Sequence, residues 1–205
     1  MNFIKVTDNK NVFADGIHDD TKPLQACIDE LKDGGTVYFP DGTYLISAAL
    51  IFYSYQHLKF SDNAVILRSD KSEPLTRYLL ASYSEPEWGA YEGTHDVVIS
   101  GGIFDGNKNL DESITLVNTV HCSNITIENC RFRHCAHWHC IEINGTENTT
   151  IQNCVFDGPH THSRQIFFLM NRFSSICHVT VHTVLFITVT ELSLISRVTI
   201  LSAVI

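Results

Sequence analysis

A repeated pattern of short β runs is the feature that most restricts how this chain can fold. The segment from His95 to Gly106 aligns with the segment from Ser123 to Phe132, and again with that from Glu147 to Gly158. The matched isoleucines at positions 99, 127 and 151 lie 28 and 24 residues apart. A repeat of this length that contains no helix is typical of one coil of a parallel β-solenoid. The chain is therefore predicted to be all-β, with equivalent positions stacked about 4.8 Å apart.

Side chains of one kind recur at equivalent positions of these repeats, which predicts ladders along the solenoid. Ladders of isoleucine and phenylalanine are expected to face the core, because both types are apolar. Cys130 and Cys154 are expected to form a buried stack of thiols, and Asn129 and Asn153 a ladder of turn amides. These positions therefore have a structural explanation. The inward positions are isoleucines 99, 127 and 151 and phenylalanines 104, 132 and 156.

The segment that precedes the repeats predicts one helix that caps the solenoid. Asp20 or Thr21 can serve as its N-cap, and Pro23 falls in the first turn, where no backbone donor is needed. The pair Gly34-Gly35 ends the helix, and short β runs follow. We therefore divide this part of the chain into a cap, residues 1–35, and β-helix coils, residues 36–163. The apolar stripe of the helix consists of Leu24, Cys27, Ile28 and Leu31.

Charge and cysteine content limit the partners and the compartment that the sequence predicts. The chain has 14 Lys and Arg against 23 Asp and Glu, a formal net charge of -9. Because it has no basic cluster, neither nucleic acid nor a membrane is expected as a partner. The first residues lack the apolar stretch of a secretory signal, and the seven cysteines favour reduced thiols over disulfides. Together these features predict a cytoplasmic or virion-associated protein.

Two motifs near the N-terminus resemble the signature of the pectate lyase superfamily. The first runs from Asp15-Gly16 through Asp19-Asp20-Thr21 to Ile28, and the second from Gly34 to Ile46. That superfamily includes polygalacturonase-like glycoside hydrolases and phage tailspike depolymerases. The resemblance covers residues 10 to about 160 and implies a right-handed single-stranded parallel β-helix with an N-terminal capping α-helix. It also implies a polysaccharide or oligosaccharide substrate in a groove on one outer face, and no cofactor.

The composition changes abruptly after residue 163. All 11 glycines and all 5 prolines, with every aspartate and lysine, lie in residues 1–163, and residues 164–205 contain none of these types. Solenoid turns usually need such residues. Our hypothesis is that this atypical apolar tail results from a frameshift or truncation, which leaves an incomplete domain. The alternative is a homo-oligomer, a trimer if the protein is tailspike-like, in which the Val- and Thr-rich tail strands pair with other chains.

The segment from His134 to Asn144 holds the densest group of chemically capable side chains. If Ile141 and Ile143 face the core, strand alternation places their even-numbered neighbours outside. These neighbours are Cys140, Glu142 and Trp138. An exposed indole can stack on the C–H face of a sugar while a carboxylate binds the sugar hydroxyls. We predict one catalytic acid in this segment and three substrate-binding residues. They are Glu142 as the acid and Trp138, His137 and His139 as the binding residues.

A second acid has no strong candidate in the sequence. An inverting glycosidase needs two carboxyls about 6.5–9.5 Å apart, which on a solenoid means one or two coils. Asp157 is the second catalytic candidate, although Asp105 and Asp157 also occupy equivalent turn positions. Asp111 and Glu112 lie about one coil before Glu142. The later motifs of polygalacturonases have no visible counterpart.

Metal chemistry fits the sequence less well. The His- and Cys-rich segment from His134 to Cys140 holds zinc-ligand types, but strand alternation separates neighbours onto opposite faces, so no metal site is predicted. A calcium-dependent lyase needs clustered acids, and none is evident. The sequence favours glycoside-hydrolase-like cleavage of a pectin-like or cell-surface polysaccharide. If the tail hypothesis holds, the protein is expected to be an incomplete and inactive copy of such an enzyme. The alternative is a non-catalytic carbohydrate-binding or phage tail adsorption module on the same scaffold.

Overall fold

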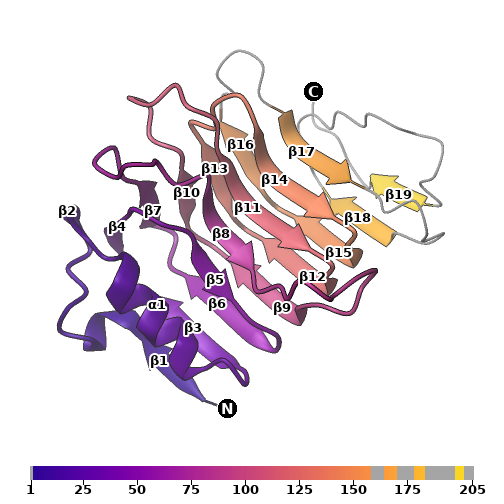
Figure 1. Cartoon of the computed structure of the whole chain (residues 1–205), viewed down its shortest axis with the longest axis horizontal. Coiled ribbons are helices and arrows are strands. Elements are labelled where there is room, and N and C mark those ends of the chain that lie inside the picture. The colour runs from indigo at the N-terminus through magenta and orange to yellow at the C-terminus, as the bar shows by residue number, and fades with distance from the viewer. Residues whose placement is uncertain (1, 158–163, 170–177, 183–196, 201–205) are drawn as a thin grey trace.

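The chain winds into a solenoid of parallel strands. The computed structural model describes residues 2–157, 164–169, 178–182 and 197–200 (Figure 1). Between residues 35 and 182, successive described strands pass in turn through three parallel sheets, here called A, B and C, so that one coil contributes one strand to each sheet. The prediction of a right-handed single-stranded parallel β-helix with an N-terminal capping helix is confirmed.

The three sheets differ in the number of strands that the described residues supply. Sheet A contains β1 (Phe3–Lys5), β3 (Gly35–Phe39), β6 (Gln56–Phe60), β9 (His95–Ser100), β12 (Ser123–Glu128), β15 (Glu147–Gln152), β18 (His178–His182) and β19 (Arg197–Ile200). Sheet B contains β2 (Asp15–Asp19), β4 (Gly42–Ile46), β7 (Ala64–Arg68), β10 (Ile103–Asp105), β13 (Arg131–Arg133) and β16 (Val155–Asp157). Sheet C contains β5 (Leu50–Phe52), β8 (Tyr78–Ser82), β11 (Thr115–Val120), β14 (His139–Asn144) and β17 (Arg164–Leu169).

Strand register confirms the alignment of the repeats. Ile127 of β12 pairs with Ile99 below it and Ile151 above it. Phe132 of β13 stacks between Phe104 and Phe156, with ring centroids 5.3 and 5.2 Å away. All six side chains are buried, as predicted.

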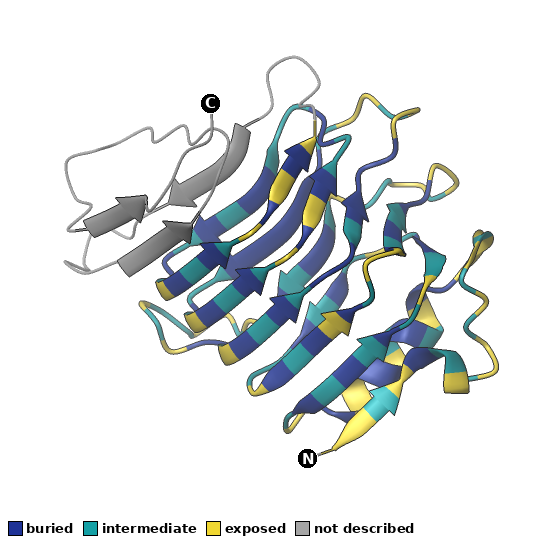
Figure 2. Cartoon of the chain, turned by 180° about the vertical axis from the view of Figure 1, so that it is seen from behind, coloured by how far each residue is buried: buried dark blue, intermediate teal, exposed yellow. Residues whose placement is uncertain are grey.

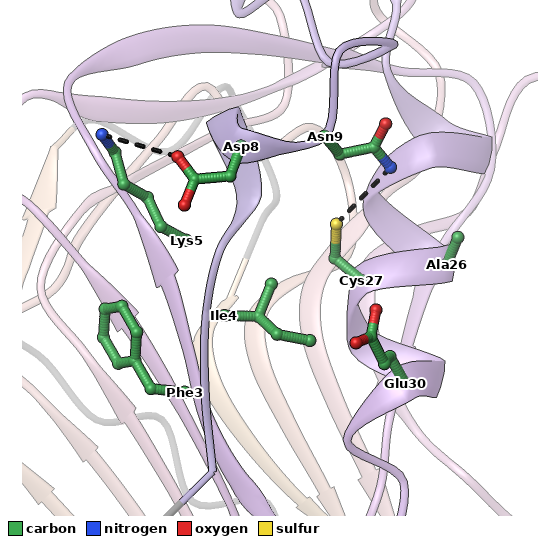
Figure 3. Close-up of a pocket in the computed structure, with 8 residues that line it drawn as sticks. All are labelled: Phe3, Ile4, Lys5, Asp8, Asn9, Ala26, Cys27 and Glu30. Atoms are coloured by element: carbon green, nitrogen blue, oxygen red, sulfur yellow. Dashed lines mark hydrogen bonds and ion pairs between the residues drawn. The ribbon is translucent and has the colours of Figure 1, made fainter.

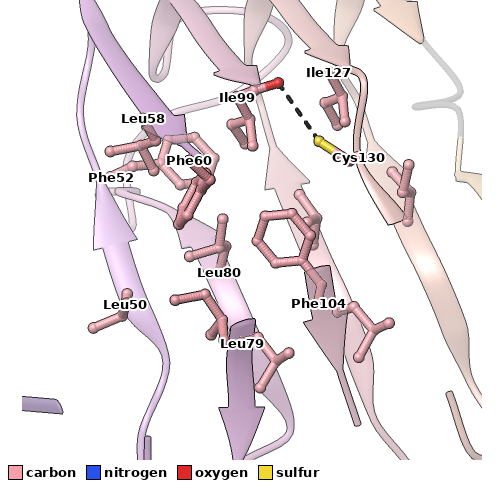
Figure 4. Close-up of a cluster of buried hydrophobic side chains, with 14 of the residues drawn as sticks. Leu50, Phe52, Leu58, Phe60, Leu79, Leu80, Ile99, Phe104, Ile127 and Cys130 are labelled. Carbon is pink, nitrogen blue, oxygen red and sulfur yellow. Dashed lines mark hydrogen bonds between the residues drawn. The ribbon is translucent and has the colours of Figure 1, made fainter. Parts of the chain in front are cut away.

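The core fills the space between the three sheets. Figure 2 shows buried residues alternating with more accessible ones along the strands, the period-2 pattern of a strand with one face inward. Figure 4 shows the same interior from close by, where Phe60, Leu80 and Phe104 come from sheets A, C and B. Cys130 and Cys154 are buried at equivalent positions, which confirms the predicted thiol stack. Burial raises the pKa of the Cys130 thiol well above its usual range.

The tight turns between sheets A and B use the left-handed backbone region. Asn129 and Asn153 have φ of 56° and 53°, a conformation that asparagine tolerates better than most residues. Gly101 has the equivalent place in the coil below, with φ of 77°. A Cβ there would lie 2.2 Å from the Phe60 carbonyl oxygen, so only glycine fits.

The α-helix α1 (Thr21–Glu30) lies at the N-terminal end of the solenoid, after the short 3₁₀ helix η1 (Val6–Asp8). Asp20 is its N-cap residue, but the Asp20 side chain makes no capping bond. Its carboxylate instead accepts the Phe13 and Ala14 amides at 2.7 and 3.0 Å. Asp19 accepts the Thr21 amide at 2.9 Å and so performs the capping that the sequence assigned to its neighbour.

Two glutamines join α1 to the first coil. The Gln25 amide donates to the Ile51 carbonyl at 3.0 Å and accepts the Ile51 amide at 2.7 Å. Because β5 is an edge strand of sheet C, Gln25 satisfies backbone groups that a further strand would otherwise bind. Gln56 is buried and donates to the Ile28 and Leu31 carbonyls at the helix end. The predicted capping role of the helix thus rests on specific hydrogen bonds as well as on its apolar stripe.

Strands from the compositionally distinct tail continue two of the sheets. Ile166 of β17 pairs with Ile141 of β14, and Val181 of β18 pairs with Ile151 of β15. Strand β19 adds to β18 in sheet A. The rest of residues 158–205 lies outside the described residues, including most of the segment on which the frameshift hypothesis depends. Within the described part of the chain, no helix has the length and apolar character needed to cross a membrane.

Candidate functional site

The chemically capable side chains gather where loops lead from sheet B into sheet C. Three successive coils supply these loops, residues 69–77, 106–114 and 134–138. A pocket of about 530 Å³ opens among them. It is lined by Arg68, Glu73, Pro74, Leu75, Arg77, Asp111, Glu112, Ser113 and Trp138, and is called the Trp138 pocket below.

Glu142 lies on β14, three residues after the start of the strand. Ile141 and Ile143 on either side are buried and Glu142 is half-buried, as alternation predicted. Its carboxylate accepts hydrogen bonds from Thr115 Oγ1 at 3.1 Å and from Asn144 Nδ2 at 2.9 Å. These two donors hold the carboxylate in one orientation, which a catalytic or sugar-binding acid requires.

Asparagine amides surround Glu142 on sheet C. Asn118 of β11 pairs with Glu142 in register and is 5% exposed. The Oδ1 atoms of Asn118 and Asn144 are buried and have no hydrogen-bond partner among the described residues. Buried acceptors without a donor are costly and commonly mark a place where a ligand or water binds.

Trp138 lines the Trp138 pocket, but one face of its ring is not open. The Arg77 guanidinium lies 5.5 Å from the ring centroid, a cation–π contact. Arg77 comes from the loop that precedes β8, two coils before Trp138. The remaining face and edge of the half-buried indole are the part that can receive an apolar sugar face.

The two predicted binding histidines have different surroundings. His137 Nε2 lies 3.1 Å from Asp111 Oδ1, and Asp111 also lines the Trp138 pocket. His137 has φ of 56° and helps to form the turn that leads into β14. His139 is the first residue of β14 and is half-buried. His137 is therefore in direct contact with a residue of the Trp138 pocket.

The second catalytic candidate, Asp157, lies on a different sheet from Glu142. It ends β16 in sheet B and forms an ion pair with Arg131 Nε at 3.1 Å. Asp105, Arg133 and Asp157 occupy one stacked position in successive coils, as the equivalence of the two aspartates predicted. Asp105 is buried and accepts from Arg133 Nε and His134 Nδ1, each at 2.7 Å. Nothing in this arrangement brings Asp157 onto the strand that carries Glu142.

One expectation about the outer face of β14 is wrong. Cys140 was expected to face outward, but it is 4% exposed. A hydrogen bond with the Cys135 thiol and burial raise the pKa of the Cys140 thiol well above its usual range. Alternation alone does not predict the burial of Cys140, because the buried Cys135 thiol from the preceding turn lies against it.

Arg68 is a pocket residue that the sequence did not single out. It follows the alternating run from Ala64 to Leu67, is 1% exposed, and donates to the Glu112 and Ser113 carbonyls at 2.8 and 3.2 Å. Burial lowers the pKa of its guanidinium. The available signal was a charged residue at the end of a β run. Its partners are backbone atoms 44 and 45 residues away, which only the folded coils bring near.

Elsewhere, a pocket of about 390 Å³ separates β1 and η1 from α1 (Figure 3). The Cys27 thiol there lies 3.7 Å from Asn9 Nδ2, and burial raises the pKa of this thiol. No group of three or more His, Cys, Asp or Glu side chains suited to a metal occurs in the described ranges.

Comparison with known proteins finds one matching family model and one curated relative. Residues 3–193 match the family model described as rhamnogalacturonase A/epimerase, pectate lyase-like. Plasmin and fibronectin-binding protein A of Streptococcus pneumoniae is 33% identical over 165 residues, which cover 70% of this chain and 22% of that protein. The chain thus spans about a fifth of the length of this curated relative.

Solved structures show the same scaffold. The crystal structure of PfbA, a surface adhesin of S. pneumoniae, has a TM-score of 0.73 and 25% identity, covering 88% of this chain and 48% of that one. A family 28 exopolygalacturonase of Yersinia enterocolitica has a TM-score of 0.68 and 16% identity, covering 88% and 42% of the two chains. The second likeness concerns the fold alone.

Proposed function

Because the chain belongs to the rhamnogalacturonase A/epimerase family of pectate lyase-like proteins, we propose that it binds a polysaccharide beside sheet C. The Trp138 pocket and the strand residues around Glu142 are the proposed contact surface. The observation that carries this proposal is the combination of an indole with buried amide oxygens that lack donors, at Asn118 and Asn144. An aromatic face and several unpaired acceptors together suit a ligand that is rich in both C–H groups and hydroxyls.

Cleavage of the polysaccharide is the further step that we propose for Glu142. Within the described strands of sheet C, Glu142 is the only carboxylate, so a second acid has to come from a loop. Glu73, Asp111 and Glu112 line the Trp138 pocket and are the available loop carboxylates. Glu142, oriented by Thr115 and Asn144, is proposed as one catalytic acid, and Asp111 as the acid to test beside it.

The direct experiment measures reducing-sugar release from a panel of acidic and neutral polysaccharides. With an active parent protein, we expect Glu142→Gln to lower kcat by roughly 10²–10⁴-fold, the usual contribution of a general acid or base. Glu128→Gln, which changes a half-buried acid of sheet A, is the matched control and should retain activity. Equal activity of parent and Glu142→Gln would rule out the catalytic role.

Binding without turnover is tested on the same panel. We expect Trp138→Ala to weaken binding by on the order of tenfold, because the apolar platform is lost, and Trp138→Phe to recover part of that loss. A Trp138→Ala protein that folds normally and binds every polysaccharide as tightly as the parent would contradict the proposed contact surface. An inactive parent that still binds would identify a carbohydrate-binding module.

A protein-binding role is the second candidate, and the similarity to the streptococcal protein favours it. That relative is named for binding plasmin and fibronectin, and its structure is titled as a surface adhesin. We propose an adhesion module exposed outside the cell as the alternative to the cytoplasmic or virion-associated location that the sequence favoured. Surface plasmon resonance with immobilised fibronectin and plasmin tests it, with a Trp138→Ala variant showing whether the two functions share a surface.

A further inference from the structure

A second pocket lies beside the strands of sheet B, apart from the proposed contact surface. Its volume is about 590 Å³. It shares no lining residue with the Trp138 pocket. The lining is Gly16, Leu45, Leu67, Asp70, Lys71, Asp105, Asn107, Lys108, Asn109, Arg133 and His134, and this is called the Arg133 pocket below.

The wall of this pocket is built around a buried carboxylate. Asp105 is 5% exposed and accepts the Asn107 amide at 2.8 Å in addition to Arg133 and His134. Arg133 uses Nε for this bond, and its two Nη nitrogens have no hydrogen-bond partner within the described residues. Asp105 therefore fixes the plane of the guanidinium and leaves its donor pair available. Such a pair matches the two oxygens of a carboxylate.

The charge of the pocket is opposite to that of the protein. Lys71, Lys108 and Arg133 are cationic, whereas Asp70 and Asp105 are the only acids in the lining, and Asp105 is already paired. Lys71 and Lys108 are exposed and make no side-chain ion pair with described residues. In a chain of formal net charge -9, three cations around one cavity indicate an anionic ligand.

The rest of the lining fits a sugar rather than a small inorganic ion. Leu45 and Leu67 supply an apolar part of the wall, and the Asn109 side chain adds amide donors and an acceptor. We propose that the Arg133 pocket binds an oxyanion-bearing sugar unit, in which Arg133 and Lys108 contact a carboxylate or sulfate group and the leucines contact the ring. This inference rests on the proposed function in one respect, namely that the ligand is a saccharide. The expectation of an anionic group comes from the pocket itself.

Three monosaccharides that differ at one carbon test this proposal. Galacturonate, galactose 6-sulfate and galactose are titrated into the isotope-labelled full chain, and binding is measured by chemical-shift changes in NMR. We expect galacturonate or galactose 6-sulfate to shift resonances of residues 105–109 and 133, and galactose to bind on the order of tenfold more weakly. Binding of the anionic sugar should also weaken as NaCl is raised. Equal affinity for galactose would overturn the proposal.

Variants assign the anion to this pocket. Arg133→Lys keeps a cation near Asp105 but removes the planar donor pair, and Lys108→Gln removes an exposed charge without breaking a bond. We expect each to weaken anionic sugar binding. The control is Arg131→Gln, which lies two residues earlier on β13 and, like Lys108→Gln, removes one positive charge. It should bind the anionic sugars as tightly as the parent protein does. An Arg131→Gln effect as large as that of Lys108→Gln would show a nonspecific response to net charge and overturn the assignment.

The two proposals fail in different ways. If no polysaccharide binds through Trp138 but galacturonate still binds through Arg133 and Lys108, the proposed contact surface is wrong and the anion pocket stands. If Trp138→Ala weakens polysaccharide binding while Arg133→Lys and Lys108→Gln leave the anionic sugars unaffected, the anion pocket is wrong and the contact surface stands. Thermal unfolding of each variant confirms that it is folded.

Discussion

A single histidine on sheet A ties the stability of the protein to pH. His57 Nε2 lies 2.6 Å from Ser100 Oγ of the next coil, and the ring is half-buried. Burial, helped by nearby Lys59, lowers the pKa of His57. The unfolded chain therefore binds this proton more readily than the folded chain, and the contribution of neutral His57 to stability is lost as the pH falls below about 6.5.

We accordingly expect the stability difference between the parent protein and His57→Gln to shift in favour of the variant as the pH is lowered from 7.5 to 5. Glutamine can still bond Ser100, but it takes up no proton. Urea unfolding at both pH values measures the difference, and an NMR titration of the His57 ring gives its midpoint. Identical pH dependence of the two proteins would show that His57 has no such effect.

Asn129 shows how one backbone angle limits the residue types that a turn accepts. With φ of 56°, it occupies the left-handed region. We expect Asn129→Ala to destabilise the protein by about 1–2 kcal/mol, and Asn129→Gly to be more stable than the alanine variant, since glycine adopts this region without strain. Urea unfolding measures both. Equal stability of the alanine and glycine variants would contradict the backbone explanation.

At the scale of elements, α1 stabilises the first coil by replacing a missing strand. Gln25 binds both backbone groups of Ile51 on the edge strand β5. A leucine at position 25 would leave these groups without their partners. We expect Gln25→Leu to cost about 1–3 kcal/mol of stability.

The matched control for that prediction is Lys22→Leu, which places the same side chain on an exposed position of the same helix. Thermal or urea unfolding compares the two variants. Hydrogen exchange at the Ile51 amide provides a local measurement, because this amide should exchange faster in Gln25→Leu alone. Unchanged protection of Ile51 would mean that the helix is held by its apolar stripe and not by Gln25.

At the scale of the whole molecule, the origin of the compositional break after residue 163 can be tested directly. The described strands β17, β18 and β19 continue sheets C and A. We keep the proposal that residues 164–205 result from a frameshift or truncation, and expect another reading frame beyond codon 163 to encode further Asn- and Gly-rich coils. Two frames without such coils would exclude this origin. Size-exclusion chromatography with light scattering then tests the alternative, a homo-oligomer.

Much of the solenoid follows from the sequence, because its interactions recur at a fixed spacing. Ile99, Ile127 and Ile151 repeat every coil, and each coil pairs with the next, so the alignment of the repeats is also the register of the strands. The positive φ of the turns is a local property of Asn129 and Gly101, whereas the Phe60 carbonyl that excludes a side chain at Gly101 comes from the coil below. Periodicity and turn chemistry therefore determined the fold class, the capping helix and the inward ladders.

The surroundings of the candidate sites depend on contacts between loops of unequal length. Such contacts do not follow the repeat of the sequence, so the repeat does not predict them. Arg68 finds its partners 44 and 45 residues away, and Arg77 covers a face of Trp138 from another coil. Cys140 is buried because the preceding turn folds over it, against the alternation of its strand. The sequence alone thus determined that the repeats stack as coils of a parallel β-helix. Only the tertiary structure decided which polar side chains meet between them, because that depends on how each loop folds over its neighbours.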